Sequence, residues 1–290
     1  MDDAALRAAQ PDTKPTNDRP LVYRQFAWTR LTHWLWAISL FFLLLTGLQI
    51  FNAHPSLYIG EQSGFAFDNS VLSFRAENTD NGPKGYTDLF GHRFDTTGVL
   101  GLSGGPDDLR ARAFPAWATI PSYQDLATGR VIHFFFAWLL SGTLLVWLFA
   151  SLINGHLRRD LAPRIADLKR LPGDIADHAR LKFHHTRDYN TLQKLTYGGV
   201  LFILLPLMIL TGLAMSPSMN AAIPFLADLF GGRQTARTIH FTVMVLLVAF
   251  FVIHMLMILA AGPINELRSI VTGWYRTDPE PKNSERSARS

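Results

Sequence analysis

Two histidines interrupt the apolar segment Arg237 to Met255, which reads RTIHFTVMVLLVAFFVIHM. No ionisable residue lies between His240 and His254, and the segment is long enough to cross a bilayer as a helix. Their separation of fourteen residues makes almost four helical turns, which places both rings on one face of the helix, about 21 Å apart along its axis. Because polar groups in hydrocarbon are costly, each histidine is a candidate functional group.

The elements that must position these histidines are long apolar blocks. Four blocks have the length that a bilayer span requires: roughly Leu31 to Phe51, Val131 to Ile153, Leu195 to Met215 and Thr238 to Ala260. Of the 290 residues, 48% are hydrophobic, and Trp and Phe are frequent, which is typical of a membrane protein. We therefore predict an all-α integral membrane protein built as a four-helix transmembrane bundle.

Basic residues indicate how the bundle is oriented. Most of the 27 Lys and Arg residues lie in the N-terminal tail (1–30), the connector between the second and third spans (155–194) and the C-terminal tail (261–290). The net charge of +4 therefore favours a membrane topology over binding of nucleic acid. By the positive-inside rule, both termini and this connector face the cytoplasm. The N-terminal tail lacks a cleavable signal peptide, so we expect a multi-pass protein of a bacterial inner membrane.

A long insertion, residues 52–129, separates the first two spans and is expected to face the periplasm. It is rich in Gly, Pro, Asp and Ser and too long for a tight turn, so we expect a small folded cap, with a disordered loop as the alternative. The four-helix domain then covers residues 31–260, and the basic connector is suited to lie near anionic lipid headgroups.

The two halves of the chain echo each other. The matching pairs are RLTHW (30–34) with KLTYG (194–198), TGL (46–48) with TGL (211–213), and GRVIHF (129–134) with ARTIHF (236–241). The echo predicts two helix pairs with similar entry geometry, although matches this short also arise by chance between apolar helices.

The topology sorts four histidines into two pairs at two depths. His33 and His254 lie near the cytoplasmic ends of their spans, whereas His133 and His240 lie near the periplasmic ends. Two facing imidazoles are the axial ligands of a b-type haem, whose macrocycle would fill the bundle core. The chain has no cysteine, which removes disulfides, iron–sulfur clusters, thiolate-bound zinc and covalently attached haem.

With these features the chain resembles the di-haem cytochrome b membrane subunits, a cytochrome b561-like family. Members serve respiratory formate dehydrogenase and nickel–iron hydrogenase, and the thiosulfate reductase cytochrome b subunits are more similar still. The resemblance runs from about Tyr23 to Trp274 and rests on the four histidine positions, on DYNTLQKLTY (188–197) and on FPAWATIPSY (114–123).

The family's ligand pattern carries over to positions of this chain. The first and last histidines hold one haem and the middle two hold the other, which implies two haem b groups on two pairs: His33 with His254, and His133 with His240. The resemblance also implies a quinone site beside the cytoplasmic haem, which nominates Asn190, Tyr189 and Gln193. Arg130 and Arg237, three residues before the periplasmic-side histidines, are candidates to pair with haem propionates or are ordinary interfacial anchors.

The resulting interpretation is a membrane-bound b-type cytochrome. It would transfer electrons between the quinone pool and a periplasmic oxidoreductase subunit, which the resemblance suggests is molybdopterin-dependent. The insertion is much longer than the equivalent loop of the formate dehydrogenase subunit, so the docking surface of that enzyme does not carry over. The alternatives are a haem protein that oxidises a small molecule such as superoxide directly, a histidine-based proton or metal transporter, and a structural anchor. The spans contain no carboxylate, which counts against the transporter.

Overall fold

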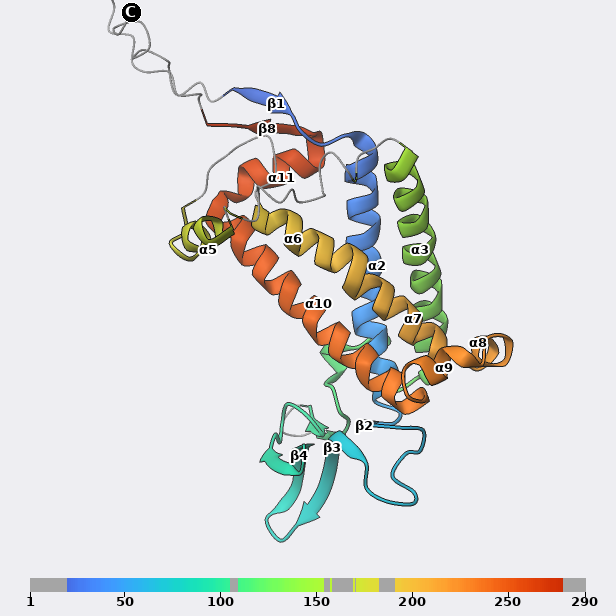
Figure 1. Ribbon diagram of the computed structural model, residues 1–290. Helices are drawn as coiled ribbons and strands as arrows, with labels where there is room; N and C mark the ends of the chain where they lie inside the picture. The colour runs from blue at the N-terminus through green and yellow to red at the C-terminus, as the bar shows by residue number, and fades with distance from the viewer. Residues whose placement is uncertain are drawn as a thin grey trace, which may run out of the picture.

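The computed structural model describes residues 20–104, 109–153, 157, 169, 171–182 and 191–278. Four helical segments in it are long and apolar enough to cross a membrane (Figure 1). They are α2 (Ala27–Phe51), α3 (Leu126–Ile153), the composite segment Thr191–Met215 and α10 (Arg233–Ala261). The predicted four-helix membrane fold is confirmed, and each helix begins a few residues before its apolar block.

The third span consists of three pieces. An α-helix, α6 (Thr191–Gly199), is followed by a π-helical stretch, η3 (Val200–Leu204), and then by α7 (Leu205–Met215). Pro206 lies at the start of α7. Its ring has no N–H to donate and crowds the preceding turn, and a wider π-turn accommodates this interruption without breaking the span.

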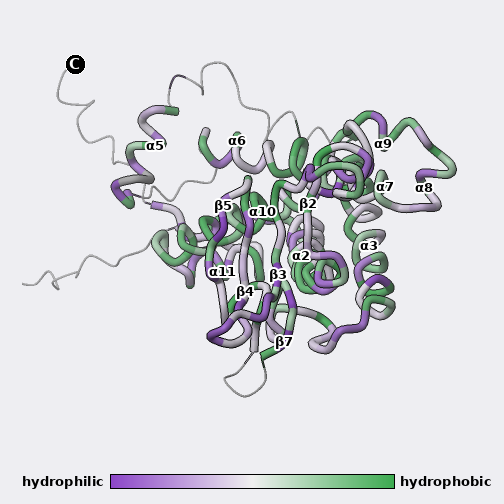
Figure 2. Tube along the Cα trace, turned by 90° about the horizontal axis from the view of Figure 1, so that it is seen from below, coloured by the Kyte–Doolittle hydropathy of each residue, from purple (hydrophilic) through white to green (hydrophobic). Residues whose placement is uncertain are grey.

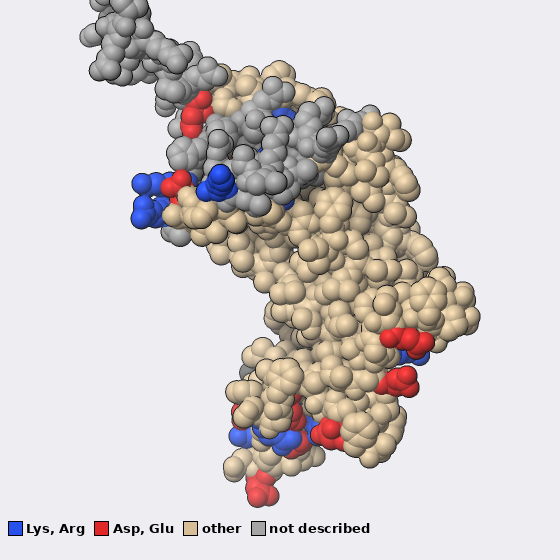
Figure 3. Space-filling model, viewed as in Figure 1, with Lys and Arg blue, Asp and Glu red and all other residues tan. Residues whose placement is uncertain are grey.

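The helices pack as two pairs, α2 with α3 and α7 with α10. A small core joins the pairs through Leu140, Leu144 and Trp147 of α3 and Leu205 of α7. Many other apolar side chains of the spans point outward, and charged residues gather at the two ends of the molecule with an uncharged belt between them (Figure 3). This distribution suits a protein whose middle lies in hydrocarbon.

The insertion folds as an antiparallel β-sheet beyond one end of the bundle, which we call the insertion end. The strands are β2 (Ser56–Tyr58), β3 (Ser70–Thr79), β4 (Gly82–Leu89) and β5 (His92–Asp95), in that order across the sheet. The insertion also contains a separate two-stranded sheet, β6 (Leu102–Ser103) with β7 (Arg110–Ala111), and a 3-10 turn, η1 (Ala116–Ala118). Viewed from below, β4 is hydrophilic whereas α3 and α10 carry hydrophobic residues (Figure 2). Because the insertion is built of strands, the predicted all-α class describes the membrane-spanning part alone.

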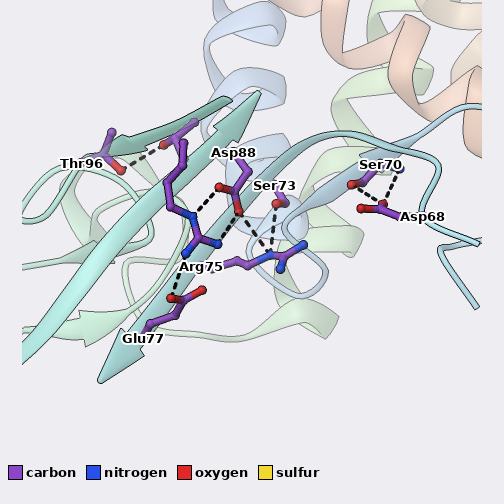
Figure 4. A network of polar contacts seen from close by, with 9 residues as sticks. Asp68, Ser70, Ser73, Arg75, Glu77, Asp88 and Thr96 are labelled. Atoms are coloured by element: carbon purple, nitrogen blue, oxygen red, sulfur yellow. Dashed lines mark hydrogen bonds and ion pairs between the residues drawn. The ribbon is translucent and has the colours of Figure 1, made fainter. Parts of the chain in front are cut away.

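Charged pairs cross the outer part of this sheet (Figure 4). Arg93 donates to Asp88 at 2.8 Å and to Glu77 at 3.0 Å. Arg75 lies 3.6 Å from Asp88, and Lys84 donates to Asp95 at 3.0 Å. These side chains are partly exposed, so each pair adds little stability and the pairs mainly favour this strand register.

Several hydrogen bonds attach the insertion to the start of α10. Thr235 Oγ1 accepts from the Gly60 backbone N–H at 2.7 Å, and Thr238 donates to the Tyr58 carbonyl at 2.7 Å. Gln234 donates to Ser63 at 2.8 Å. A buried aromatic cluster on the other side joins Phe74 of β3 to Phe51 of α2, so the sheet rests on two different membrane helices.

The opposite end of the bundle, which we call the terminal end, brings the two ends of the described chain together. Strand β1 (Leu21–Tyr23) pairs with β8 (Trp274–Arg276), and α11 (Pro263–Thr272) lies beside them (Figure 1). The other helices of the described residues are α5 (Leu171–Ala179), toward this end, and α8 (Pro217–Ala222) and α9 (Phe225–Leu229), toward the insertion end (Figure 1). The predicted C-terminal tail, 261–290, thus contains a helix and a strand, while residues 279–290 lie outside the described part.

Candidate haem sites

The insertion-end pair consists of His133 on α3 and His240 on α10. Their side chains are close enough for their charges to interact. His133 Nδ1 lies 3.0 Å from Thr46 Oγ1, and His240 Nδ1 lies 3.0 Å from Thr211 Oγ1. The two halves of the chain therefore hold their histidines in the same way.

The threonine contacts determine the tautomer of each ring. Thr46 donates its own proton to the Phe42 carbonyl at 2.6 Å, and Thr211 donates to the Leu207 carbonyl at 2.7 Å. Each threonine oxygen is therefore placed to accept from the histidine Nδ1–H, and a backbone carbonyl, of Leu43 for His133 and of Met208 for His240, lies within hydrogen-bond reach of the same ring. The Nε2 atom then keeps its lone pair, which is the form in which histidine binds a metal.

A glycine beside each threonine lets the ring come close. A Cβ atom at Gly47 would lie 3.4 Å from His133 Cε1, and one at Gly212 would lie 3.4 Å from His240 Cε1. Both glycines and both threonines stand in the TGL motifs of the sequence echo, and the contact of the threonines with the histidines was not predicted from the sequence.

The terminal-end pair consists of His33 on α2 and His254 on α10, which also lie near enough for their charges to interact. His33 Nδ1 is buried and has no hydrogen-bond partner among the described residues. The His254 ring stacks on Phe250, with centroids 5.6 Å apart, and meets the edge of Tyr197 at 6.5 Å. Tyr197 occupies the position of His33 in the echo of RLTHW and KLTYG.

Both pairs fit the axial ligand set of a b-type haem. Each offers two imidazoles from different helices inside an apolar bundle, which is the donor arrangement that bis-histidine ligation needs. A cage of three or more His, Cys, Asp or Glu side chains occurs nowhere in the described part of the chain, so the donors are unlike those of a structural zinc site.

The two nominated arginines differ in their surroundings. Arg237 donates from Nη2 to the His54 carbonyl, and its guanidinium lies over the Phe51 ring at 5.2 Å. Arg130 is exposed and lies over the Phe134 ring at 5.7 Å. Their pairing with haem propionates stays a prediction.

Of the nominated quinone residues, Tyr189 and Asn190 lie outside the described residues. Gln193 lies on α6, one turn before Tyr197 and therefore on the helix face that turns toward His254. A second polar group at this end was not predicted from the sequence: Tyr275 donates to Glu266 at 2.9 Å. Burial and then the Glu266 carboxylate raise the pKa of Tyr275.

Two comparisons with known proteins found a similarity to this chain. Residues 168–273 match the family model for prokaryotic cytochrome b561. The chain is similar to the putative protein-methionine-sulfoxide reductase subunit YedZ1 of Azospira oryzae, with 32% identity over 128 residues. That match covers 43% of this chain and 62% of the relative, so the chain spans less than two thirds of the relative's length. No solved structure matches the chain.

The structure shows four helices that are long and apolar enough to span a membrane, with two pairs of histidines between them. The matched segment, residues 168–273, makes this part of the chain similar to the prokaryotic cytochrome b561 family, in line with the sequence resemblance.

Proposed function

We propose that the chain binds two b-type haems, one at each histidine pair, and transfers electrons across the membrane between the quinone pool and a redox partner at the insertion end. The observation that carries this proposal is the placement of four histidines from three helices as two facing pairs at two levels. His240 and His254 set the levels, about 21 Å apart on one face of α10.

The proposed orientation places the protein in a bacterial inner membrane with both termini in the cytoplasm and the insertion in the periplasm. Its support is the excess of Lys and Arg in the terminal-end segments of the sequence. Helix α11 adds to it, because Ile264, Leu267 and Val271 are exposed apolar residues on a short helix that also carries Arg268, as expected of a helix at a lipid headgroup surface.

The chain's own residues hold and orient the cofactors. A haem at each level supplies a one-electron carrier inside hydrocarbon. The Thr46 and Thr211 oxygens fix the rings of His133 and His240 with Nε2 available for the iron. The apolar side chains of the spans exclude water from both levels.

The terminal end has polar groups that suit a quinone site. Hydroquinone releases two protons with its two electrons, so a quinone site must accept and pass on protons. Gln193, with Tyr189 and Asn190, is proposed to hold the quinone ring beside His254. The Glu266 carboxylate, hydrogen-bonded to Tyr275, provides a proton acceptor close to that histidine.

The proposed partner is a periplasmic oxidoreductase subunit. The similar YedZ1 protein is named as a subunit of a reductase, and the family resemblance suggests a molybdopterin-dependent partner. The insertion exposes large aromatic side chains, among them Phe65, Phe67 and Trp117, and such residues favour protein contacts. Direct oxidation of a small molecule such as superoxide needs no such docking surface.

The experiment is a dithionite-reduced minus oxidised visible spectrum of the purified full chain, with pyridine haemochrome quantitation. We expect low-spin b-type bands and about two haems per chain, one for each bis-histidine pair. A chain that stays colourless after expression with excess haem would refute the proposal. One haem per chain would refute the two-level electron path.

A further inference from the structure

The insertion contains a buried cation that pairs with no carboxylate of the described residues. Arg112 is only 7% exposed. It donates to the Ser122 carbonyl at 2.6 Å, to Thr119 Oγ1 at 2.9 Å and to Gln49 Oε1 at 3.1 Å, all of which are neutral acceptors. Its Nε atom is buried without a partner in the described structure. Burial and then the like charge of Arg110 lower the pKa of Arg112, and a buried charge of this kind calls for an anion.

Contacts place the Arg112 guanidinium about one helical turn further toward the insertion end than the histidine pair. Gln49, which accepts from Arg112, stands one helical turn beyond Thr46, the residue that contacts His133. Gly129 stands one turn before His133 on α3, and a Cβ atom there would lie 3.2 Å from Gln49 Cγ. The Gln49 side chain thus lies between the helices at the next level outward, with Arg112 against it.

The anion that belongs at this level is a carboxylate of the haem itself. Haem b carries two propionates, which are ionised at neutral pH and must point away from hydrocarbon toward the nearer end of the bundle. Arg112 is at that end, and a guanidinium with a free N–H is the side chain best suited to a carboxylate. We propose that Arg112 is the counter-ion of a propionate of the insertion-end haem; this rests on the proposed haem site at His133 and His240.

Arg112 differs from the two arginines that the sequence nominated for this role. Arg130 is exposed beside Phe134, and Arg237 donates to the His54 carbonyl with its guanidinium over Phe51, whereas of these three arginines Arg112 has the buried Nε atom without a partner in the described structure. Arg112 belongs to the insertion (residues 52–129), which we also call the β-unit. The β-unit therefore supplies a positive charge to the haem site at His133 and His240 in addition to covering it.

Loss of this charge changes the reduction equilibrium of one haem. Without the cation, the negative propionate favours the ferric state, so the midpoint potential falls. A unit charge at protein dielectric shifts a one-electron equilibrium on the order of tenfold, which is about 59 mV. The test is a potentiometric titration of the purified full chain carrying Arg112→Gln or Arg112→Lys, with Arg75→Gln, a half-exposed arginine of the same β-unit, as the matched control.

We expect Arg112→Gln to lower the potential of one haem and leave the other unchanged, while Arg112→Lys and Arg75→Gln stay near the wild-type values. An Arg112→Gln protein with two haems at unchanged potentials would overturn the inference and leave the proposed function standing. Equal shifts in the Gln and Lys variants would overturn it too, since the charge would then not be the cause. A wild-type chain without haem would instead be a failure of the proposed function.

A second measurement decides the matter if Arg112→Gln does not fold. Redox-difference infrared spectra are recorded with haem labelled with carbon-13 at its propionates, on the wild type and Arg112→Lys. Lysine keeps the charge but loses the planar fork, so we expect the labelled carboxylate bands to shift. Identical bands in the two proteins would show that Arg112 does not contact a propionate.

Discussion

Thr46 Oγ1 and His133 Nδ1 lie 3.0 Å apart, and the same distance separates Thr211 Oγ1 from His240 Nδ1. One threonine belongs to each half of the chain, so the contact is duplicated across the bundle. Since each threonine oxygen accepts the Nδ1–H, the two facing rings are oriented by separate helices, α2 and α7. The internal repeat in the sequence thus corresponds to two equivalent threonine–histidine hydrogen bonds at one level of the bundle, which we call the threonine clamp.

The first prediction concerns the contact between Thr46 and His133 in the threonine clamp. Thr46→Val removes the hydroxyl and keeps the shape of the side chain, so His133 loses the Thr46 acceptor and keeps only the Leu43 backbone carbonyl. Groups that orient metal-bound histidines typically contribute about 10- to 100-fold in affinity, and we expect the insertion-end haem to bind more weakly by a factor in that range. Haem titration of the apoprotein measures it.

The matched control for this variant is Thr242→Val. Thr242 is exposed on α10 and donates to the Thr238 carbonyl of its own helix. Equal loss of affinity in the two variants would show that the Thr46 contact does not orient the ligand.

The second prediction concerns the glycine under each ring. Gly47→Leu inserts a side chain where a Cβ alone would already lie 3.4 Å from His133 Cε1, so the ring must move. We expect loss of the insertion-end haem. Gly142→Leu on α3 is the control, because nothing lies within 4 Å of its Cβ position. Haem per chain is the measurement, and two haems in Gly47→Leu would contradict the proposed close approach.

The third prediction separates the two histidine pairs. His240→Ala is expected to remove the insertion-end haem and His254→Ala the terminal-end haem, each leaving about half of the bound haem because one axial ligand is lost. Haemochrome quantitation and a redox titration together show which haem remains. His92→Ala, on the exposed strand β5, should keep both. If His240→Ala and His254→Ala retain the same haem, the assignment of pairs is wrong.

The membrane fold could be predicted because it depends on local properties of the sequence. Apolar blocks of sufficient length must form helices in a bilayer, since every backbone group needs an internal partner. The fixed rise of the helix then sets the levels of His240 and His254 without any knowledge of the neighbouring helices.

The rest depends on contacts between distant residues. The Thr46 and Arg112 contacts join segments that come together only when the bundle and the insertion pack, and no spacing rule predicts them. One turn of the β-sheet does have a local signal in the sequence. Asn81 and Gly82 are a residue pair typical of hairpin turns, and the chain turns from β3 to β4 at this point. Phe90 and Gly91, both at positive φ, make the next turn with a residue that sequence rules disfavour.

A fourth prediction concerns Gly232, where the insertion meets the start of α10. A Cβ atom there would lie 2.7 Å from the Gly60 carbonyl oxygen, and the backbone has a φ of 105°. Gly232→Ala should therefore loosen this junction, with a loss in the free energy of unfolding of about 1–3 kcal/mol from backbone strain in addition to the clash. Limited proteolysis of the insertion and thermal unfolding in detergent measure the effect.

The control for the strain alone is Gly82→Ala. Gly82 also has positive φ, 96°, but nothing lies within 4 Å of its Cβ position. We expect the larger effect at Gly232, because only that variant pushes the sheet away from the helix. Equal effects would mean that the contact with Gly60 adds nothing to the junction.

The final prediction is the response of the β-unit to acid. Hydrogen bonds from Thr97 and then Lys84 hold the pKa of Asp95 at about 2, below its ordinary 3.8. Hydrogen bonds from Arg93 likewise lower the pKa of Asp88. A carboxylate with a depressed pKa stabilises the fold above its unfolded pKa, and this contribution is lost as the pH falls through the folded value. The insertion should therefore become easier to digest with pepsin between pH 3.8 and about 2.

Asp95→Asn tests the origin of this response. The variant has no carboxylate to protonate at that position, so digestion should be faster at pH 4 than in the wild type and should rise less as the pH falls toward about 2. Asp80→Asn, an exposed residue in the turn between β3 and β4, is the matched control and should keep the wild-type pH profile. A steep wild-type profile in Asp95→Asn would place the acid-sensitive group elsewhere in the sheet.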